Sequence, residues 1–115
     1  MERIVPDDIG CNEDVVLDAG HLARQTFGDA ALERELLVLF SGQSAALAAR
    51  IVAGEAPERR MAAHTLKGSA RAVGAWALAA AAAAVEAGDG GPERLEAELA
   101  RAQAAIRDRL AQDAG

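Results

Sequence analysis

The stretch AHTLKGSARAVGA, Ala63–Ala75, combines a helical pattern of apolar residues with one histidine and two basic residues. At about 100° per residue, the side chains at 66, 70, 73 and 77 stack on one face, which predicts a helix packed against a core. His64 lies about 200° around this helix from Leu66. We therefore expect the helix to bury Leu66 and to present His64 on its opposite face, in line with Arg60, Lys67, Gly68, Arg71 and Ala75.

The rest of the chain predicts an all-α fold. Alanine, the best helix former, supplies 30 of the 115 residues, whereas Phe and Trp together supply three. Helices are expected over about 12–26, 30–52, 57–74 and 75–87, and from Pro92 onward after the turn GDGGP. Because four of them are long and joined by short connections, we predict an antiparallel four-helix bundle with a short extra N-terminal helix.

The same periodicity predicts a core and a domain boundary. The helix over 30–52 should bury Leu32, Leu36, Phe40, Leu47 and Ile51, with Gln43 on the same line. The first and last helices should contribute Val15, Val16, Leu22, Phe27, Leu95, Leu99, Ala102, Ile106 and Leu110. Residues 1–13 are expected to form a flexible arm and residues 14–113 a single bundle domain.

Composition excludes several classes of function. A net charge of −6 argues against nucleic-acid binding. The single cysteine cannot form an internal disulfide, and the N-terminus has no apolar signal segment, so a cytoplasmic protein is expected. The uncharged stretch Ala72–Val85 is too short to span a bilayer. Two distant histidines and no Glu-x-x-His pair argue against a metal site.

The residues around His64 suit phosphoryl chemistry. From Arg59 to Val85 there is no acidic residue but four basic ones. Positive charge disfavours protonation of a neighbouring imidazole, and a neutral imidazole is a nucleophile. Lys67 can reach a phosphoryl oxygen beside His64, and Gly68 leaves room for a partner. Arg71 is either a solvated charge or a phosphate contact, and Trp76 is expected to be a core or groove anchor.

The segment HTLKGSARAVGA resembles the signature of histidine phosphotransfer (HPt) domains of phosphorelays. The matching residues are His64, Leu66, Lys67, Gly68, Ser69, Ala70 and Gly74. The preceding segment FGDAALERELLVLFSGQSAALAARI also resembles that family, so the resemblance covers roughly residues 17–112. It implies a four-helix bundle in which His64 is phosphorylated, Lys67 helps to hold the phosphoryl group and Gly68 makes room for the incoming domain.

The resemblance also implies partners and supporting residues. The partners would be response-regulator receiver domains, alone or as part of a hybrid sensor histidine kinase, with Mg²⁺ bound by the receiver and no cofactor bound here. No autokinase activity is expected, because the chain has no nucleotide-binding motif. A monomer is the expected state. Supporting or partner contacts are expected from Arg60, Ser69, Arg71, Gly74 and Glu86.

Two questions stay open from the sequence, the role of Glu86 and the function of the bundle. Several members of the family have a glutamine about 22 residues after the histidine, where this chain has Glu86. Its carboxylate could accept the ring N–H of His64, could repel a phosphoryl group, or could simply be solvated at a helix end. The second question concerns function: the bundle could bind a receiver or another signalling protein without carrying phosphate.

Overall fold

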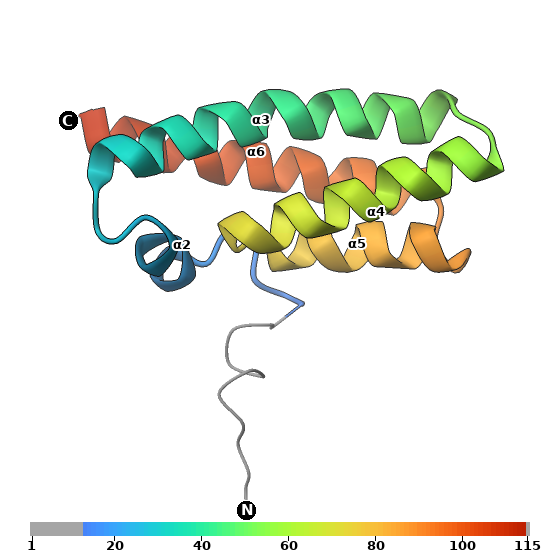
Figure 1. Ribbon diagram of the computed structural model, residues 1–115, viewed down its shortest axis with the longest axis horizontal. Helices are drawn as coiled ribbons and strands as arrows, with labels where there is room; N and C mark the ends of the chain where they lie inside the picture. The colour runs from blue at the N-terminus through green and yellow to red at the C-terminus, as the bar shows by residue number, and fades with distance from the viewer. Residues whose placement is uncertain (1–12, 115) are drawn as a thin grey trace, which may run out of the picture.

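The structure is a computed structural model that describes residues 13–114. Its helices are α2 (Ala19–Gln25), α3 (Ala30–Ala53), α4 (Ala56–Val73), α5 (Trp76–Ala87) and α6 (Pro92–Ala114). The last four alternate in direction along the bundle (Figure 1). α3 and α5 each pack against both α4 and α6, so the four helices close around one core. No strand occurs between residues 13 and 114, and the all-α prediction is confirmed.

Local signals set the ends of the long helices. The Asp29 side chain caps α3 by accepting a hydrogen bond from the Leu32 amide at 3.1 Å. Pro57 stands in the first turn of α4, where its missing N–H is harmless. α4 and α5 end at Gly74 and Gly88, whose φ angles of 81° and 83° are left-handed. The predicted bounds of α3, α4 and α5 and the predicted start of α6 therefore agree with the observed helices to within one residue.

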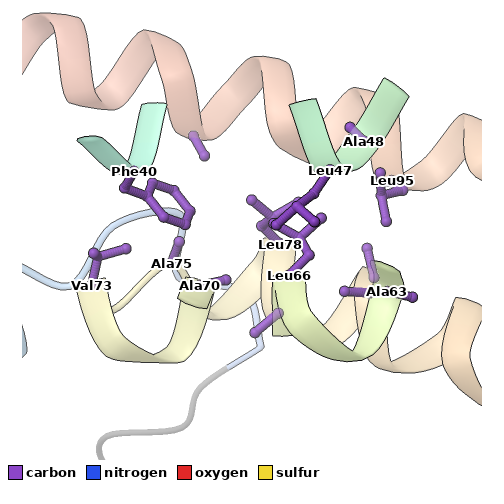
Figure 2. Close-up of a cluster of buried hydrophobic side chains, with 14 of the residues drawn as sticks. Phe40, Leu47, Ala48, Ala63, Leu66, Ala70, Val73, Ala75, Leu78 and Leu95 are labelled. Atoms are coloured by element: carbon purple, nitrogen blue, oxygen red, sulfur yellow. The ribbon is translucent and has the colours of Figure 1, made fainter. Parts of the chain in front are cut away.

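The core is formed where α3, α4 and α5 meet, with α6 closing it. Figure 2 shows Phe40 of α3 over Val73 and Ala75, and Leu47 of α3 beside Leu66 of α4 and Leu78 of α5. Small buried side chains separate them, which lets α4 and α5 approach closely. Seven of the residues predicted for the core are buried: Leu22, Phe40, Leu47, Ile51, Leu95, Ala102 and Ile106; Val16, Leu36, Leu99 and Leu110 are partly buried against it.

Three residues predicted for the core are exposed instead. Phe27 is 89% exposed because the chain leaves α2 at this point with a left-handed φ of 56°, which turns the ring outward. Leu32 is 41% exposed, and Gln43 is also exposed. The reason is geometric: at about 100° per residue, Leu32 and Gln43 lie roughly 80° and 60° to one side of Phe40 around α3. The buried residues Leu37 and Ser44 lie to the other side of Phe40, so the core face of α3 is turned away from Leu32 and Gln43.

The N-terminal helix begins later than predicted. α2 starts at Ala19 and not at residue 12, because backbone groups before it bond to the α4–α5 corner. The carbonyl of Val15 accepts from the Ala77 amide at 2.8 Å, and the Asp18 amide donates to the Gly74 carbonyl at 2.9 Å. Tertiary hydrogen bonds thus replace the expected helical ones. The arm predicted over 1–13 lies outside the described residues, except for Glu13.

α3 is long and apolar enough, by length and composition alone, to cross a membrane. In the bundle, α3 buries one face against α4 and α6, with Leu37, Phe40 and Leu47 in the core. Only 33% of its apolar window is buried, and Val38, Leu39 and Val52 are exposed. Packing within the bundle therefore accounts for only part of its apolar composition.

Candidate functional site

The hairpin of α4 and α5 places His64 opposite Glu86. His64 is ten residues before Gly74 and Glu86 is ten residues after Trp76, so both lie about 15 Å from the corner between the helices. His64 Nδ1 and Glu86 Oε2 are 2.6 Å apart. Glu86 thus contacts the imidazole from α5, whereas Gln43 lies on the exposed side of α3.

Glu86 also binds Lys67. Its second oxygen, Oε1, lies 2.6 Å from Lys67 Nζ, so one carboxylate bridges the two residues of α4. The Lys67 and Glu86 side chains are half-buried at 21% and 26% exposure, whereas His64 is 67% exposed. The hydrogen bond from Lys67, followed by that from His64, holds the pKa of Glu86 below its ordinary value. Glu86 is therefore ionised at neutral pH.

The ionised state of Glu86 fixes the tautomer of the imidazole. A carboxylate can only accept hydrogen bonds, so the proton between the two groups resides on His64 Nδ1. The other ring nitrogen, Nε2, then carries the lone pair. Because the ring is largely exposed, Nε2 is the nucleophilic atom that a partner can reach.

The charges around His64 differ from those that the linear sequence predicts. The segment from Arg59 to Val85 has no acidic residue, but the fold brings Glu86 into its centre, and Lys67 is already paired there. Arg59 is directed elsewhere: it donates to the carbonyls of Ile51 and Gly54 at 2.9 and 3.2 Å. Arg60 is exposed and lines a shallow hollow together with Glu86. The fold therefore pairs Lys67 with a carboxylate beside the imidazole, in place of the wholly basic surroundings that the sequence indicated.

Gly68 and Ser69 lie on the accessible side of α4. A Cβ added at Gly68 would meet no atom within 4 Å, so packing within this chain does not require glycine there. Ser69 is half-buried and lines an apolar groove between α3 and α4 with Leu36, Leu39 and Phe40. Leu39 is 71% exposed beside this groove. The surface next to the motif is thus open at Gly68 and apolar toward α3.

Arg71 and Gly74 lie farther along α4 from His64. Arg71 is exposed and lines a hollow with His21 and Trp76. Gly74 is buried and ends α4, and its carbonyl accepts from the Asp18 amide, so the structure places it at the helix cap in a supporting position. Ala75, expected on the His64 face, is fully buried because the chain reverses at Gly74.

Trp76 is the anchor that the sequence predicted. It is 7% exposed, and its indole Nε1 donates to Asp18 Oδ2 at 2.9 Å. The His21 ring packs edge-on against it, with ring centroids 4.9 Å apart. Asp18 was not identified from the sequence, although an aspartate directly before a helix is a known N-cap signal. The cluster therefore belongs to the scaffold that holds the α4–α5 corner.

Within residues 13–114, no group of three or more His, Cys, Asp or Glu side chains is arranged to hold a metal ion. Glu86, the carboxylate nearest the histidine, is engaged by Lys67 instead. The contacts of His64 with Glu86 and the nearby Lys67 support nucleophilic attack by an oriented imidazole, with an ammonium group alongside.

Comparisons with known proteins identify the family of the chain. The sequence model of the Hpt domain matches residues 30–113. Among solved structures, the chain is similar to the histidine phosphotransferase ShpA from Caulobacter crescentus, with 32% identity and a TM-score of 0.78. That match covers 87% of this chain and 95% of the other. No curated protein matches significantly. The similarity thus extends over most of both chains.

Proposed function

The chain belongs to the Hpt domain family, and from this premise we propose that it carries a phosphoryl group on His64 between receiver domains. Members of this family are phosphocarriers rather than catalysts, and they work in phosphorelays. The observation that supports the proposal for this chain is the exposed His64 ring, whose Nδ1 is held by Glu86 and whose Nε2 is available. The donor would be an aspartyl phosphate of one receiver, and the acceptor would be the free aspartate of another.

The transfer step follows from this tautomer. The Nε2 lone pair attacks the phosphorus of the receiver's aspartyl phosphate, an N–P bond forms, and the P–O bond to the aspartate breaks. The aspartate leaves as a carboxylate. The Nδ1 proton stays on the ring, where Glu86 accepts its hydrogen bond. The reverse sequence passes the phosphoryl group to a second receiver, so no proton has to enter or leave the site.

The neighbouring residues have distinct parts in this proposal. Lys67 donates to a phosphoryl oxygen, and the open space at Gly68 admits the receiver's active-site edge. Arg60 and Arg71 are exposed cations that would meet the acidic rim of a receiver. The apolar groove beside Ser69 would seat an apolar part of the same partner. Positioning comes from docking, as in other phosphoryl transfers.

The proposal also covers the partners and setting. The phosphoryl donor is a receiver domain, free or within a hybrid sensor histidine kinase, and the Mg²⁺ needed for transfer belongs to the receiver. We expect a soluble cytoplasmic monomer without autokinase activity. A kinase assay with ATP and Mg²⁺ alone should therefore leave the protein unlabelled.

The experiment is phosphotransfer from a panel of receiver domains charged with acetyl phosphate and Mg²⁺. Wild-type protein should acquire acid-labile, base-stable phosphate on His64, located by mass spectrometry. A His64→Gln variant should acquire none, whereas His21→Gln, a change of the chain's other histidine, should behave as wild type. If a receiver binds the wild type and His64→Gln equally and no phosphate is transferred, the bundle is a binding module without this chemistry.

A further inference from the structure

We propose that Glu86 controls how firmly the phosphoryl group is held, because its carboxylate and the phosphoryl group share one cation, Lys67. This inference rests on the proposed function and concerns the lifetime of the phosphohistidine at the same site. In the resting state Lys67 Nζ is 2.6 Å from Glu86 Oε1. Glu86, which orients His64, therefore also binds Lys67, the cation that a phosphoryl group on His64 would need.

Lys67 is the cation best placed for the phosphoryl group. It lies one helical turn after His64 on the same face of α4, and its side chain is half-buried. Arg59 is occupied by two backbone carbonyls at the end of α3. Arg60 and Arg71 are exposed to solvent, where their charge is screened. The charge of Lys67, and its sharing with Glu86, should therefore influence the phosphoryl group more strongly than the charge of either arginine.

The two states of the site make different demands on Lys67. Before transfer, the ammonium group neutralises Glu86 beside the imidazole. After transfer, Nε2 carries a phosphoryl group with about two negative charges. The ammonium group has three N–H donors and can contact both anions, but each contact reduces the charge available to the other. Glu86 thus weakens the hold of Lys67 on the phosphoryl group.

The second contact of Glu86 acts in the same direction. Its Oε2 retains the proton on Nδ1 while Nε2 bears phosphorus, so the phosphorylated ring carries positive charge. A cationic ring is a better leaving group than a neutral one, because it departs as an uncharged imidazole. Both contacts therefore make the phosphohistidine short-lived and ready to transfer. The substitution Glu86→Gln would keep an acceptor for Nδ1–H but would release Lys67.

The test charges His64 directly with phosphoramidate, a small phosphoryl donor, so that it does not depend on finding the cognate receiver. The lifetime of the phosphohistidine is then followed by ³¹P NMR in wild type, Glu86→Gln, Lys67→Met and the double variant. Glu86→Gln should lengthen the lifetime roughly three- to tenfold, the range given by a half-buried ion pair. Lys67→Met should shorten the lifetime by a larger factor in the Glu86→Gln background than in the wild-type background.

Glu98→Gln is the matched control, because it removes the same charge from an ion pair on α6, where Glu98 contacts Arg101 at 3.1 Å. It should leave the lifetime unchanged, and thermal unfolding should show that every variant is folded. An unchanged or shorter lifetime in Glu86→Gln overturns the inference, as does an equal effect of Lys67→Met in both backgrounds. If the phosphohistidine forms and responds as expected but exchanges with no receiver, the proposed function fails and the sharing of Lys67 stands.

Discussion

The Trp76 indole Nε1 donates a hydrogen bond to Asp18 Oδ2 at 2.9 Å, across 58 residues of sequence. The other oxygen of Asp18 accepts from the His21 amide at 3.0 Å and caps α2. The Asp18 backbone amide donates to the Gly74 carbonyl at 2.9 Å. One aspartate thus holds together the start of α2, the end of α4 and the start of α5. It thereby fixes the α4–α5 corner, and the position of this corner determines that His64 and Glu86 lie opposite each other.

Replacing Asp18 by alanine should lower the free energy of unfolding by about 2–3 kcal/mol, because α2 loses its cap and a buried indole N–H loses its acceptor. Urea unfolding measures the change. Asp108→Ala, at an exposed position of α6, is the control and should change stability by about 0.5 kcal/mol or less. Equal effects of the two substitutions would contradict the role assigned to Asp18.

The same contacts predict a pH dependence. Partial burial opposes ionisation of Asp18, but the hydrogen bonds from Trp76 and His21 outweigh it and lower its pKa. In the unfolded chain this carboxyl group titrates near its ordinary value of about 3.9. As the pH falls, the unfolded state therefore binds the proton first. The stability contributed by Asp18 should be complete above about pH 5 and lost progressively through pH 4 and below.

Asp18→Asn provides the measurement, because asparagine does not titrate in this range. The difference in unfolding free energy between wild type and Asp18→Asn should be largest near neutral pH and should shrink on acidification. A difference that stays constant from pH 7 to pH 3 would show that the carboxylate has the same pKa in both states.

Gly74→Ala should destabilise the fold more than Gly88→Ala. Both glycines end a helix with left-handed φ, of 81° and 83°, and alanine is strained by about 1–2 kcal/mol in that region. At Gly74 the new Cβ would also lie 3.0 Å from two atoms of Asp18, whereas at Gly88 it would meet nothing within 4 Å. Thermal or urea unfolding of the two variants compares them directly, and equal losses would argue against close packing at the corner.

Local sequence signals account for most of the fold. Capping aspartate, first-turn proline and terminal glycine act within a few residues, so the bounds of α3–α6 could be predicted. The motif around His64 likewise identified Lys67 and Gly68 and the resemblance to HPt domains, and the match to the Hpt domain confirms the family. The roles of the individual residues in transfer stay predictions.

The parts that failed depend on contacts between distant segments. The backbone of residues 15–18 bonds to Gly74 and Ala77, and no local pattern shows that these groups are engaged there instead of in a helix. Gly74 matches the family motif, but its left-handed φ and buried position give it a structural use. The pairing of Lys67 with Glu86 could be predicted only if the register between α4 and α5 were known. The spacing of 22 residues from His64 to Glu86 suggested a contact for His64 alone.

Glu33 and Arg109 connect α3 to α6, with Nε–Oε2 and Nη2–Oε1 distances of 2.6 and 3.1 Å. Because Glu33 is 6% exposed, Arg109→Met would leave a buried carboxylate with less compensation and should lower the free energy of unfolding by about 2–4 kcal/mol. Arg107→Met, at an exposed position of the same helix, is the control. The double variant Glu33→Leu with Arg109→Met should recover much of the loss, and failure to recover it would indicate that the charges themselves are required.

Gly68→Gln should separate transfer from folding. Gly68 lies inside α4, and glutamine has a better helix propensity by up to about 1 kcal/mol. A side chain at this position meets open space, so the unfolding free energy should stay the same or rise. Phosphotransfer from a phosphorylated receiver should nevertheless fall more than tenfold, because the new side chain occupies the approach to His64 Nε2.

Gly42→Gln is the matched control, since Gly42 is also an exposed mid-helix glycine, on α3, and a Cβ added there would meet no atom within 4 Å. If Gly68→Gln transfers as fast as Gly42→Gln, the receiver does not approach over this part of α4.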